Sequence, residues 1–172
     1  DLLLQRFVDI WQAFPGLLFV IFVVSIFGHS RFTLICTISA LLAAGSSRLI
    51  RGMTLSVKNL SFVEAARALG AGGGHIVLQH VLPNVSSIIL INASIQLGAV
   101  MLIESTLSFL GFGVPPPFPS WGRMLNEAKL QMQYHPYLAL FPGLAIAVTV
   151  YAANMLGDAL RDVLDPRLRG SK

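Results

Sequence analysis

The chain has 172 residues, of which 55% are hydrophobic and only 12% charged, and its mean hydropathy is +0.73. A soluble domain carries about 25% charged residues, so this composition excludes an ordinary soluble domain and indicates a lipid bilayer. The formal net charge of +4 comes without an aromatic-basic strip or a zinc knuckle. The positive excess therefore favours loops beside anionic lipid over a nucleic-acid partner.

Four apolar runs of about 20 residues are predicted to span the membrane, which makes the fold class all-α and polytopic. They cover roughly residues 7–27, 32–50, 85–110 and 137–156. The second and third runs carry several Thr, Ser, Asn and Gln residues. Such helices suit contact with protein or a watery pathway better than contact with lipid.

Basic residues are distributed unequally between the two sides of these spans, nine against three. The richer side holds Arg6, Arg48, Arg51, Lys58, Arg67, Arg161, Arg167, Arg169 and Lys172, and the poorer side holds Arg31, Arg123 and Lys129. The positive-inside rule predicts that the richer side is cytoplasmic. The loop of about 52–84 and the C-terminus are then inside, and the segment of about 111–136 is outside. Asp9 is expected to pair with Arg6 at the inner end of the first span.

The inner loop is predicted to be structured. Residues 62–69 have high helix propensity, and Ser61 and Glu64 have the spacing of a capping box. Gly70 stands where a helix C-cap belongs, and 72–74 allow a sharp turn. A second short helix over 75–81 is expected to stop before Pro83. Two short helices at a glycine corner form a compact knob (residues 61–83) suited to a groove on a partner.

The outer segment has a different character. Residues 111–122 are rich in proline, glycine and aromatic side chains, which excludes a continuous helix. We expect an ordered cap at the membrane surface, with Trp121 and either Tyr134 or Tyr137 at the interface.

One motif on the inner loop is specific. Glu64-Ala65-Ala66 is followed after three residues by Gly70, and after nine more by His80 and then Val81-Leu82-Pro83. This arrangement resembles the EAA loop of binding-protein-dependent ABC importers, through which the membrane subunit docks on its ATPase. Histidine at position 80, where the usual pattern has a branched apolar residue, is typical of the dipeptide, oligopeptide and nickel branch. The residues that the resemblance assigns to ATPase coupling are Glu64, Ala65, Ala66, Gly70, His80, Leu82 and Pro83.

The resemblance extends over the whole chain. It includes 6–18, the outer signature at 104–122, Pro142-Gly143, and the last helix and tail at 154–169. It implies a type I ABC importer permease core, the MetI-like fold, as a single transmembrane domain over 1–172. Family members are longer and begin with further helices, so the chain is expected to be N-terminally incomplete.

The resemblance also implies a function and partners. The chain would be the pathway subunit of an ATP-driven importer of di- or oligopeptides in a bacterial or archaeal inner membrane. Its partners would be two ATP-binding subunits, a homologous second permease and an extracytoplasmic solute-binding protein. The chain has no phosphate-binding loop with its lysine, since the glycines at 70–74 lack both lysine and a preceding strand. We therefore expect no enzymatic activity and no cofactor of its own, with ATP and Mg bound by the partner ATPases.

Four polar residues within the spans are weighed as pathway or gate residues. Glu104 is the one acid near the outer end of a span, where a carboxylate is costly unless it faces water or a partner. The alternative for Glu104 is a structural bond to the backbone amides around Ser105 and Thr106. Asn92, Gln96 and Asn154 could line a path, although interhelical hydrogen bonds account for them more simply. No metal site is expected, because His75 and His80 are five residues apart.

Alternatives remain open. One changes only the cargo, to nickel or another small solute. Another is an ATP-independent channel or secondary carrier, which would need no ATPase and would use an ion-coupling acid at the midplane. A third is an orphan subunit that assembles but conducts nothing.

Overall fold

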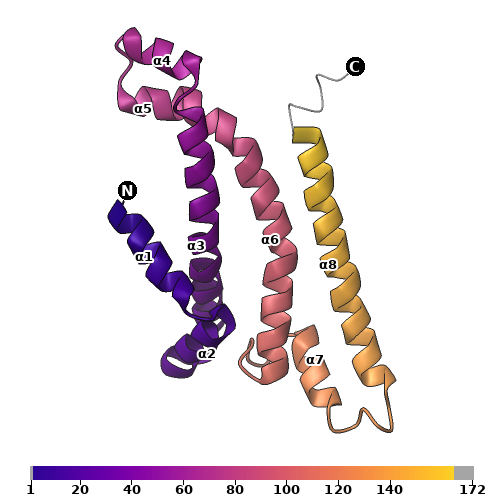
Figure 1. Cartoon of the computed structure of the whole chain (residues 1–172). Coiled ribbons are helices and arrows are strands. Elements are labelled where there is room, and N and C mark those ends of the chain that lie inside the picture. The colour runs from indigo at the N-terminus through magenta and orange to yellow at the C-terminus, as the bar shows by residue number, and fades with distance from the viewer. Residues whose placement is uncertain (1, 165–172) are drawn as a thin grey trace.

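The computed structural model describes residues 2–164, and within that range the chain is helical and contains no strand. Figure 1 shows the long helices α3, α6 and α8, with a knob of short helices beyond one end of α3 and α6 and a loop-and-helix cap at the opposite end of α6 and α8. The elements are α1 (Leu2–Ala13), α2 (Gly16–Phe27), α3 (Arg31–Val57), α4 (Ser61–Ala68), α5 (Gly73–His75), the π-helix η1 (Ile76–Val81), α6 (Leu82–Leu110), α7 (Trp121–Ala128) and α8 (Tyr137–Leu164).

The structure has three or four candidate spans, against the four predicted. Among residues 2–164, three helices are long and apolar enough to cross a membrane, namely Arg31–Val57, Gly73–Leu110 and Tyr137–Leu164. The bent pair α1 and α2 makes a fourth if it counts as one span. The helices α3 and α8 run on past the predicted ends at 50 and 156.

The first span is broken rather than continuous, which corrects the prediction of one helix over 7–27. Its two halves meet at an angle of 86°. Helix α1 ends at Ala13, and Pro15 stands at the N-cap of α2. Proline has no N–H to donate and its ring clashes with the carbonyl four residues earlier, so the chain turns here.

The third span begins earlier than predicted, because Pro83 does not end a helix. Residues 73–110 form one helix of 38 residues. In the π-helical part the Leu82 N–H donates to the Val77 carbonyl, five residues back. Pro83 follows directly, so the residue without an N–H stands where the π-turn has already interrupted the regular bonding four residues back. The Asn84 side-chain amide donates to the His80 carbonyl at 2.7 Å and satisfies an acceptor in this turn.

Helices α6 and α8 approach closely through small residues. A Cβ added to Gly98 would lie 2.8 Å from Asn154 Oδ1, and one added to Gly157 would lie 3.0 Å from Ile95 Cγ1. Small residues at such crossings let membrane helices pack backbone to backbone. Asn154 therefore lies at a helix–helix contact.

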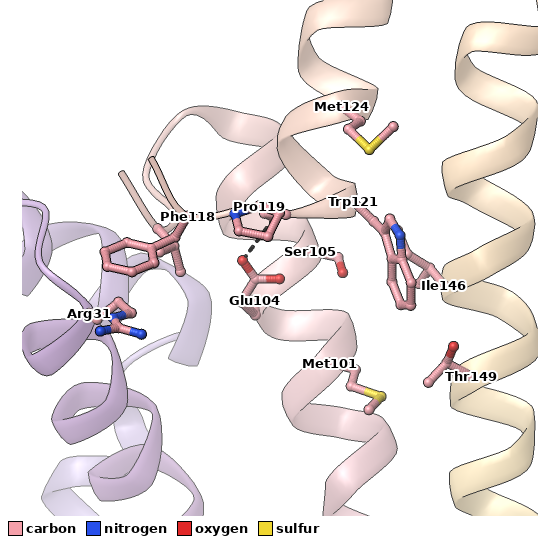
Figure 2. Close-up of a pocket in the computed structure, with 12 residues that line it drawn as sticks. Arg31, Met101, Glu104, Ser105, Phe118, Pro119, Trp121, Met124, Ile146 and Thr149 are labelled. Carbon is pink, nitrogen blue, oxygen red and sulfur yellow. Dashed lines mark hydrogen bonds between the residues drawn. The ribbon is translucent and has the colours of Figure 1, made fainter. Parts of the chain in front are cut away.

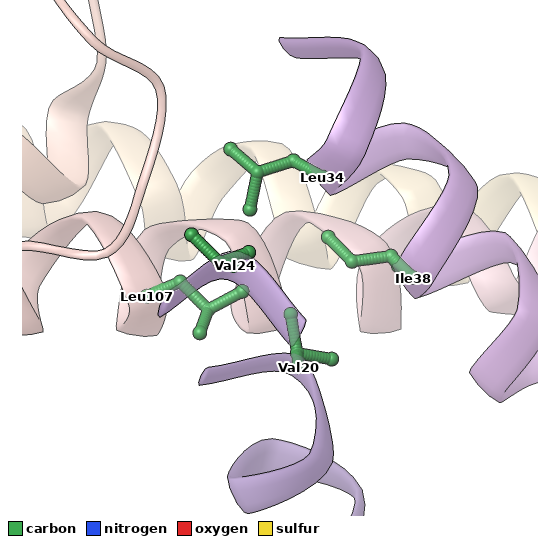
Figure 3. Packing of buried hydrophobic residues seen from close by; sticks show 5 residues of the cluster. All are labelled: Val20, Val24, Leu34, Ile38 and Leu107. Atoms are coloured by element: carbon green, nitrogen blue, oxygen red, sulfur yellow. The ribbon is translucent and has the colours of Figure 1, made fainter. Parts of the chain in front are cut away.

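A buried apolar cluster joins α2, α3 and α6 toward the end opposite the knob. Val20 and Val24 of α2 pack with Leu34 and Ile38 of α3 and with Leu107 of α6 (Figure 3). Val20, Val24 and Leu107 are fully buried. On α1, Asp9 forms an ion pair with Arg48 of α3. The predicted pair of Asp9 with Arg6 is therefore wrong. The packing of α1 against α3 brings Asp9 to Arg48.

Candidate functional site

The knob is a packed unit with its own small core. Val63 of α4 is fully buried against Val57, Ile76, Val81 and Val85. Residues from α3, α4, η1 and α6 thus share one cluster, which holds α4 against the continuous helix that starts at Gly73. Figure 1 shows α4 and α5 together beyond the end of the long helices.

Gly70 ends α4 as predicted. Its φ is +81°, the left-handed region that favours glycine. The Gly70 N–H donates to the Arg67 carbonyl and the Ala71 N–H to the Ala66 carbonyl, both at 3.0 Å. These two bonds are those of a Schellman cap, and Ala71 packs on the core of the knob.

The predicted capping box at the other end of α4 is wrong. Ser61 is the first residue of the helix, and the N-cap is Leu60, which makes no side-chain hydrogen bond. Glu64 lies in the first turn, where its charge interacts favourably with the helix dipole.

The residues assigned to ATPase coupling lie mostly on the surface of the knob. Because Val63 points inward, Glu64 and Ala65 are exposed and Ala66 is half-buried. Gly70, Leu82 and Pro83 are also exposed, whereas His80 is half-buried. The geometry thus brings the two halves of the motif onto one structural unit.

His80 lies between two other rings. Its centroid is 6.1 Å from that of Phe62 and 5.8 Å from that of His75. In a π-helix, residues five apart lie on the same face. His75 and His80 therefore lie side by side, although their spacing would separate them on an α-helix. In residues 2–164 no group of three or more His, Cys, Asp or Glu side chains could hold a metal ion.

The knob also exposes large apolar side chains, which the sequence analysis did not predict. The exposed fractions are 89% for Leu69, 65% for Leu78 and 53% for Val77. The knob core takes only Val63 from α4 and does not include Leu69, Val77 or Leu78. The available signal in the sequence was that so short a segment holds more apolar residues than it can bury. Exposed apolar side chains gathered on one small unit are candidates for contact with a partner.

Gly70→Ala is expected to loosen the knob by about 1–2 kcal/mol, the cost of an L-residue in the left-handed region. An added Cβ would meet nothing within 4 Å, so the effect is conformational rather than steric. Gly72→Ala is the matched control, since it has equally open space but a φ of −67°. Hydrogen exchange of the α4 amides in the full-length protein should rise for Gly70→Ala alone. Equal exchange in both variants would contradict the role of the cap.

Two of the predicted pathway residues make interhelical hydrogen bonds. The Asn92 and Gln96 amides of α6 donate to Ser46 Oγ of α3 at 3.1 and 2.6 Å. Ser46 Oγ donates in turn to the Leu42 carbonyl at 3.0 Å. This cluster ties α3 to α6 midway along both helices.

Glu104 bonds to side-chain hydroxyls, and not to the backbone amides that its structural alternative named. Its Oε1 accepts hydrogen bonds from Ser108 Oγ at 2.6 Å and from Ser120 Oγ at 3.0 Å. The second of these ties α6 to the outer segment. Glu104 also lines a cavity at the end of the molecule opposite the knob (Figure 2).

The outer segment is an ordered cap as predicted, and it contains a helix, α7, that sequence reasoning missed. The Arg123 guanidinium donates to the Phe118 carbonyl at 2.7 Å, and Asn126 donates to the Phe109 carbonyl. Gly111 closes α6 with a φ of +91°. The amphipathic run that follows the prolines, residues 121–128, was the available signal for α7.

These features define an α-helical, multi-pass membrane protein with a packed knob at one end and an ordered cap at the other. Residues 1–170 match the family described as the binding-protein-dependent transport system inner membrane component, and the chain belongs to that family. The resemblance to membrane subunits of binding-protein-dependent importers is thereby confirmed, as are the MetI-like fold and a place in the inner membrane.

Named permeases are similar to nearly all of this chain. The oligopeptide transport system permease protein OppC of Haemophilus influenzae is 41% identical over 169 residues, which is 98% of this chain and 54% of that protein. The glutathione transport system permease proteins GsiD of Shigella flexneri and Pectobacterium atrosepticum are each 43% identical, over 99% and 98% of this chain and 56% of theirs. The chain spans about half the length of the curated relatives it matches.

Proposed function

We propose that the protein is the membrane-spanning pathway subunit of an ATP-driven importer of di- or oligopeptides. The observation that carries the proposal is the family match over residues 1–170, together with relatives named for oligopeptide and glutathione transport. Glutathione is itself a tripeptide, so both named cargoes are short peptides. This favours peptides over nickel as the cargo.

The proposed partners are two ATP-binding subunits, a homologous second permease and an extracytoplasmic solute-binding protein. ATP and Mg bind to the ATPases, and this chain contributes no catalytic residue and no cofactor. The knob supports the ATPase contact, because it presents Glu64, Ala65 and the exposed Leu69 and Leu78 on a folded unit rather than on a slack loop.

The continuous helix of residues 73–110 supports a mechanism of coupling. The knob core fixes α4 to the start of this helix, and the helix reaches Glu104 near the opposite end. Closure of the ATPase pair moves the knob, and the rigid helix transmits that displacement across the membrane. The spans then rock between inward-open and outward-open states.

The proposed orientation places the knob and the C-terminus in the cytoplasm. Among described residues of the richer side, Arg6 lies on α1, and the others lie at the knob end of α3, on the knob and near the end of α8, namely Arg48, Arg51, Lys58, Arg67 and Arg161. Arg31, Arg123 and Lys129 belong to the start of α3 and the outer segment. This distribution supports the assignment by the positive-inside rule. Arg167, Arg169 and Lys172 lie outside the described residues.

Affinity purification of the tagged full-length protein from native membranes in mild detergent tests the proposal. We expect a P-loop ATPase, a second permease and a solute-binding protein among the co-purifying proteins. Reconstitution of that assembly should give ATP-dependent uptake of a peptide that the binding protein selects. Purification of the tagged protein without partners would favour a carrier or an orphan subunit. Uptake of nickel but not of peptides would show that the cargo is nickel.

A further inference from the structure

We propose that the cavity at the outer end binds a short zwitterionic peptide, with Glu104 receiving its ammonium group and Arg31 its carboxylate. The proposal rests on the proposed function and adds to it a direct contact between this chain and its cargo. It concerns one cavity, which is separate from the knob and from the cluster around Ser46.

The cavity has the size and lining of a small-molecule site. Its volume is about 580 Å³, within the range of about 300–1,000 Å³ typical of ligand pockets. Its walls come from α3, α6, the outer segment, α7 and α8. The residues that carry the argument are Arg31, Met101, Glu104, Phe118, Trp121 and Ile146. Glu104 and Arg31 supply the only two charges of the described lining.

One oxygen of the Glu104 carboxylate is held by the protein, and the other is available to a ligand. Its Oε1 is held by the hydroxyls of Ser108 and Ser120, whereas its Oε2 accepts no hydrogen bond from residues 2–164. No Lys or Arg side chain of this described range forms an ion pair with Glu104. A half-buried carboxylate near the end of a span is costly without a partner. A ligand ammonium group would supply the missing charge through a charge-assisted hydrogen bond.

Arg31 is held by a different contact that leaves its donors free. The guanidinium carbon lies 3.8 Å from the centroid of the Phe118 ring. Contact with the ring fixes the side chain without using its N–H groups. Arg31 makes no hydrogen bond or ion pair with the described part of the chain. The planar guanidinium is suited to bind a carboxylate through two parallel hydrogen bonds.

The rest of the lining is mostly apolar and adaptable, and Ser105, Ser120 and Thr149 are its uncharged polar residues. Figure 2 shows Arg31 and Phe118 on one side of Glu104, and Trp121 and Ile146 on the other. Met101 and Met124 also line the wall, and methionine side chains adjust to different shapes. The two charges would bind the termini of a peptide, and the adaptable walls would accept various side chains. Such a site would select short peptides without selecting their sequence.

The test uses the full-length protein with its partner subunits in phosphatidylcholine nanodiscs, and trialanine as the probe. Binding is followed by Trp121 emission, with Trp121→Phe to identify the signal. We expect Glu104→Gln to weaken trialanine binding about tenfold and to leave binding of N-acetyl-trialanine unchanged. Arg31→Gln should weaken trialanine by a similar factor and leave trialanine amide unchanged. The amide of E104Q still accepts the two serine hydrogen bonds, so the cap should remain folded.

Two residues of the same outer segment give matched controls. Glu127 is 69% exposed and does not line this cavity, so Glu127→Gln should leave trialanine binding unchanged. Lys129 also lies over a ring, with Nζ 4.1 Å from the Phe109 centroid, and it too is outside the cavity. Lys129→Gln is therefore the control for Arg31→Gln.

Several outcomes would overturn the inference. One is a loss of affinity in Glu104→Gln that is equal for the free and the N-acetylated peptide. Another is no binding to the wild-type assembly, as expected if another segment of the protein fills the cavity. Loss of trialanine binding on adding phosphatidylethanolamine would assign the site to a lipid headgroup. ATP-driven peptide uptake by the same wild-type assembly separates these results from failure of the proposed function.

Discussion

Gly122→Ala is expected to destabilise the protein more strongly than Gly70→Ala does. A Cβ at this position would collide with the Ser105 carbonyl oxygen, and it would lie 2.8 Å from both Ser105 Cα and Ser108 Cβ. Two of these three atoms belong to the backbone of α6, which cannot move aside as a flexible side chain can. Overpacking of this kind costs on the order of 3 kcal/mol. The measurement is the midpoint of thermal unfolding of the full-length protein in detergent.

Gly143→Ala is the matched control for this prediction. Gly143 is also a helical glycine, in α8, but an added Cβ would meet nothing within 4 Å. Alanine there should be neutral or slightly stabilising because of its higher helix propensity. A similar loss of stability in both variants would contradict the close approach of α7 to α6 at Gly122.

The sequence predicted the spans and the knob because their signals are local. Long apolar runs report membrane helices directly, and a glycine after a helix-forming segment reports a left-handed cap, as Gly70 does. The two prolines show the limit of local rules. Pro15 breaks its span by 86°, whereas Pro83 lies inside a helix of 38 residues. The difference depends on the π-turn before Pro83, which no single-residue propensity encodes.

The contacts of the polar site residues could not be predicted from the sequence, because their partners are distant in the chain. Glu104 bonds to Ser120 in the outer segment. Asn92 and Gln96 bond to Ser46 on another helix. Asp9 has Arg6 close in sequence but pairs with Arg48 instead. In each case helix packing selects the partner, so the sequence identified the residue and only the structure identified its contacts.

The second large effect is expected from Glu64→Arg in the proposed ATPase contact. Glu64 is exposed on α4 and makes no ion pair with the described residues. Reversal of its charge should therefore leave membrane insertion and the knob core intact. At an interface that is complementary to a carboxylate, the substituted cation would meet like charge, which costs several kcal/mol. Recovery of the ATPase with the tagged full-length protein should fall at least tenfold, and ATP-dependent uptake should fall with it.

Glu127→Arg makes the same change of charge on the outer segment and is the control. Glu127 is exposed and pairs only loosely, at 3.6 Å, with Arg123, so this variant should retain the ATPase. Gly70→Ala provides a second comparison, because it loosens the knob without changing its charge. If Glu64→Arg recovers as much ATPase as the wild type, the knob is not the docking surface and the proposed coupling mechanism fails. Loss of the ATPase in Glu64→Arg but not in Glu127→Arg would instead locate the contact on α4, since the two variants differ only in where the charge is placed.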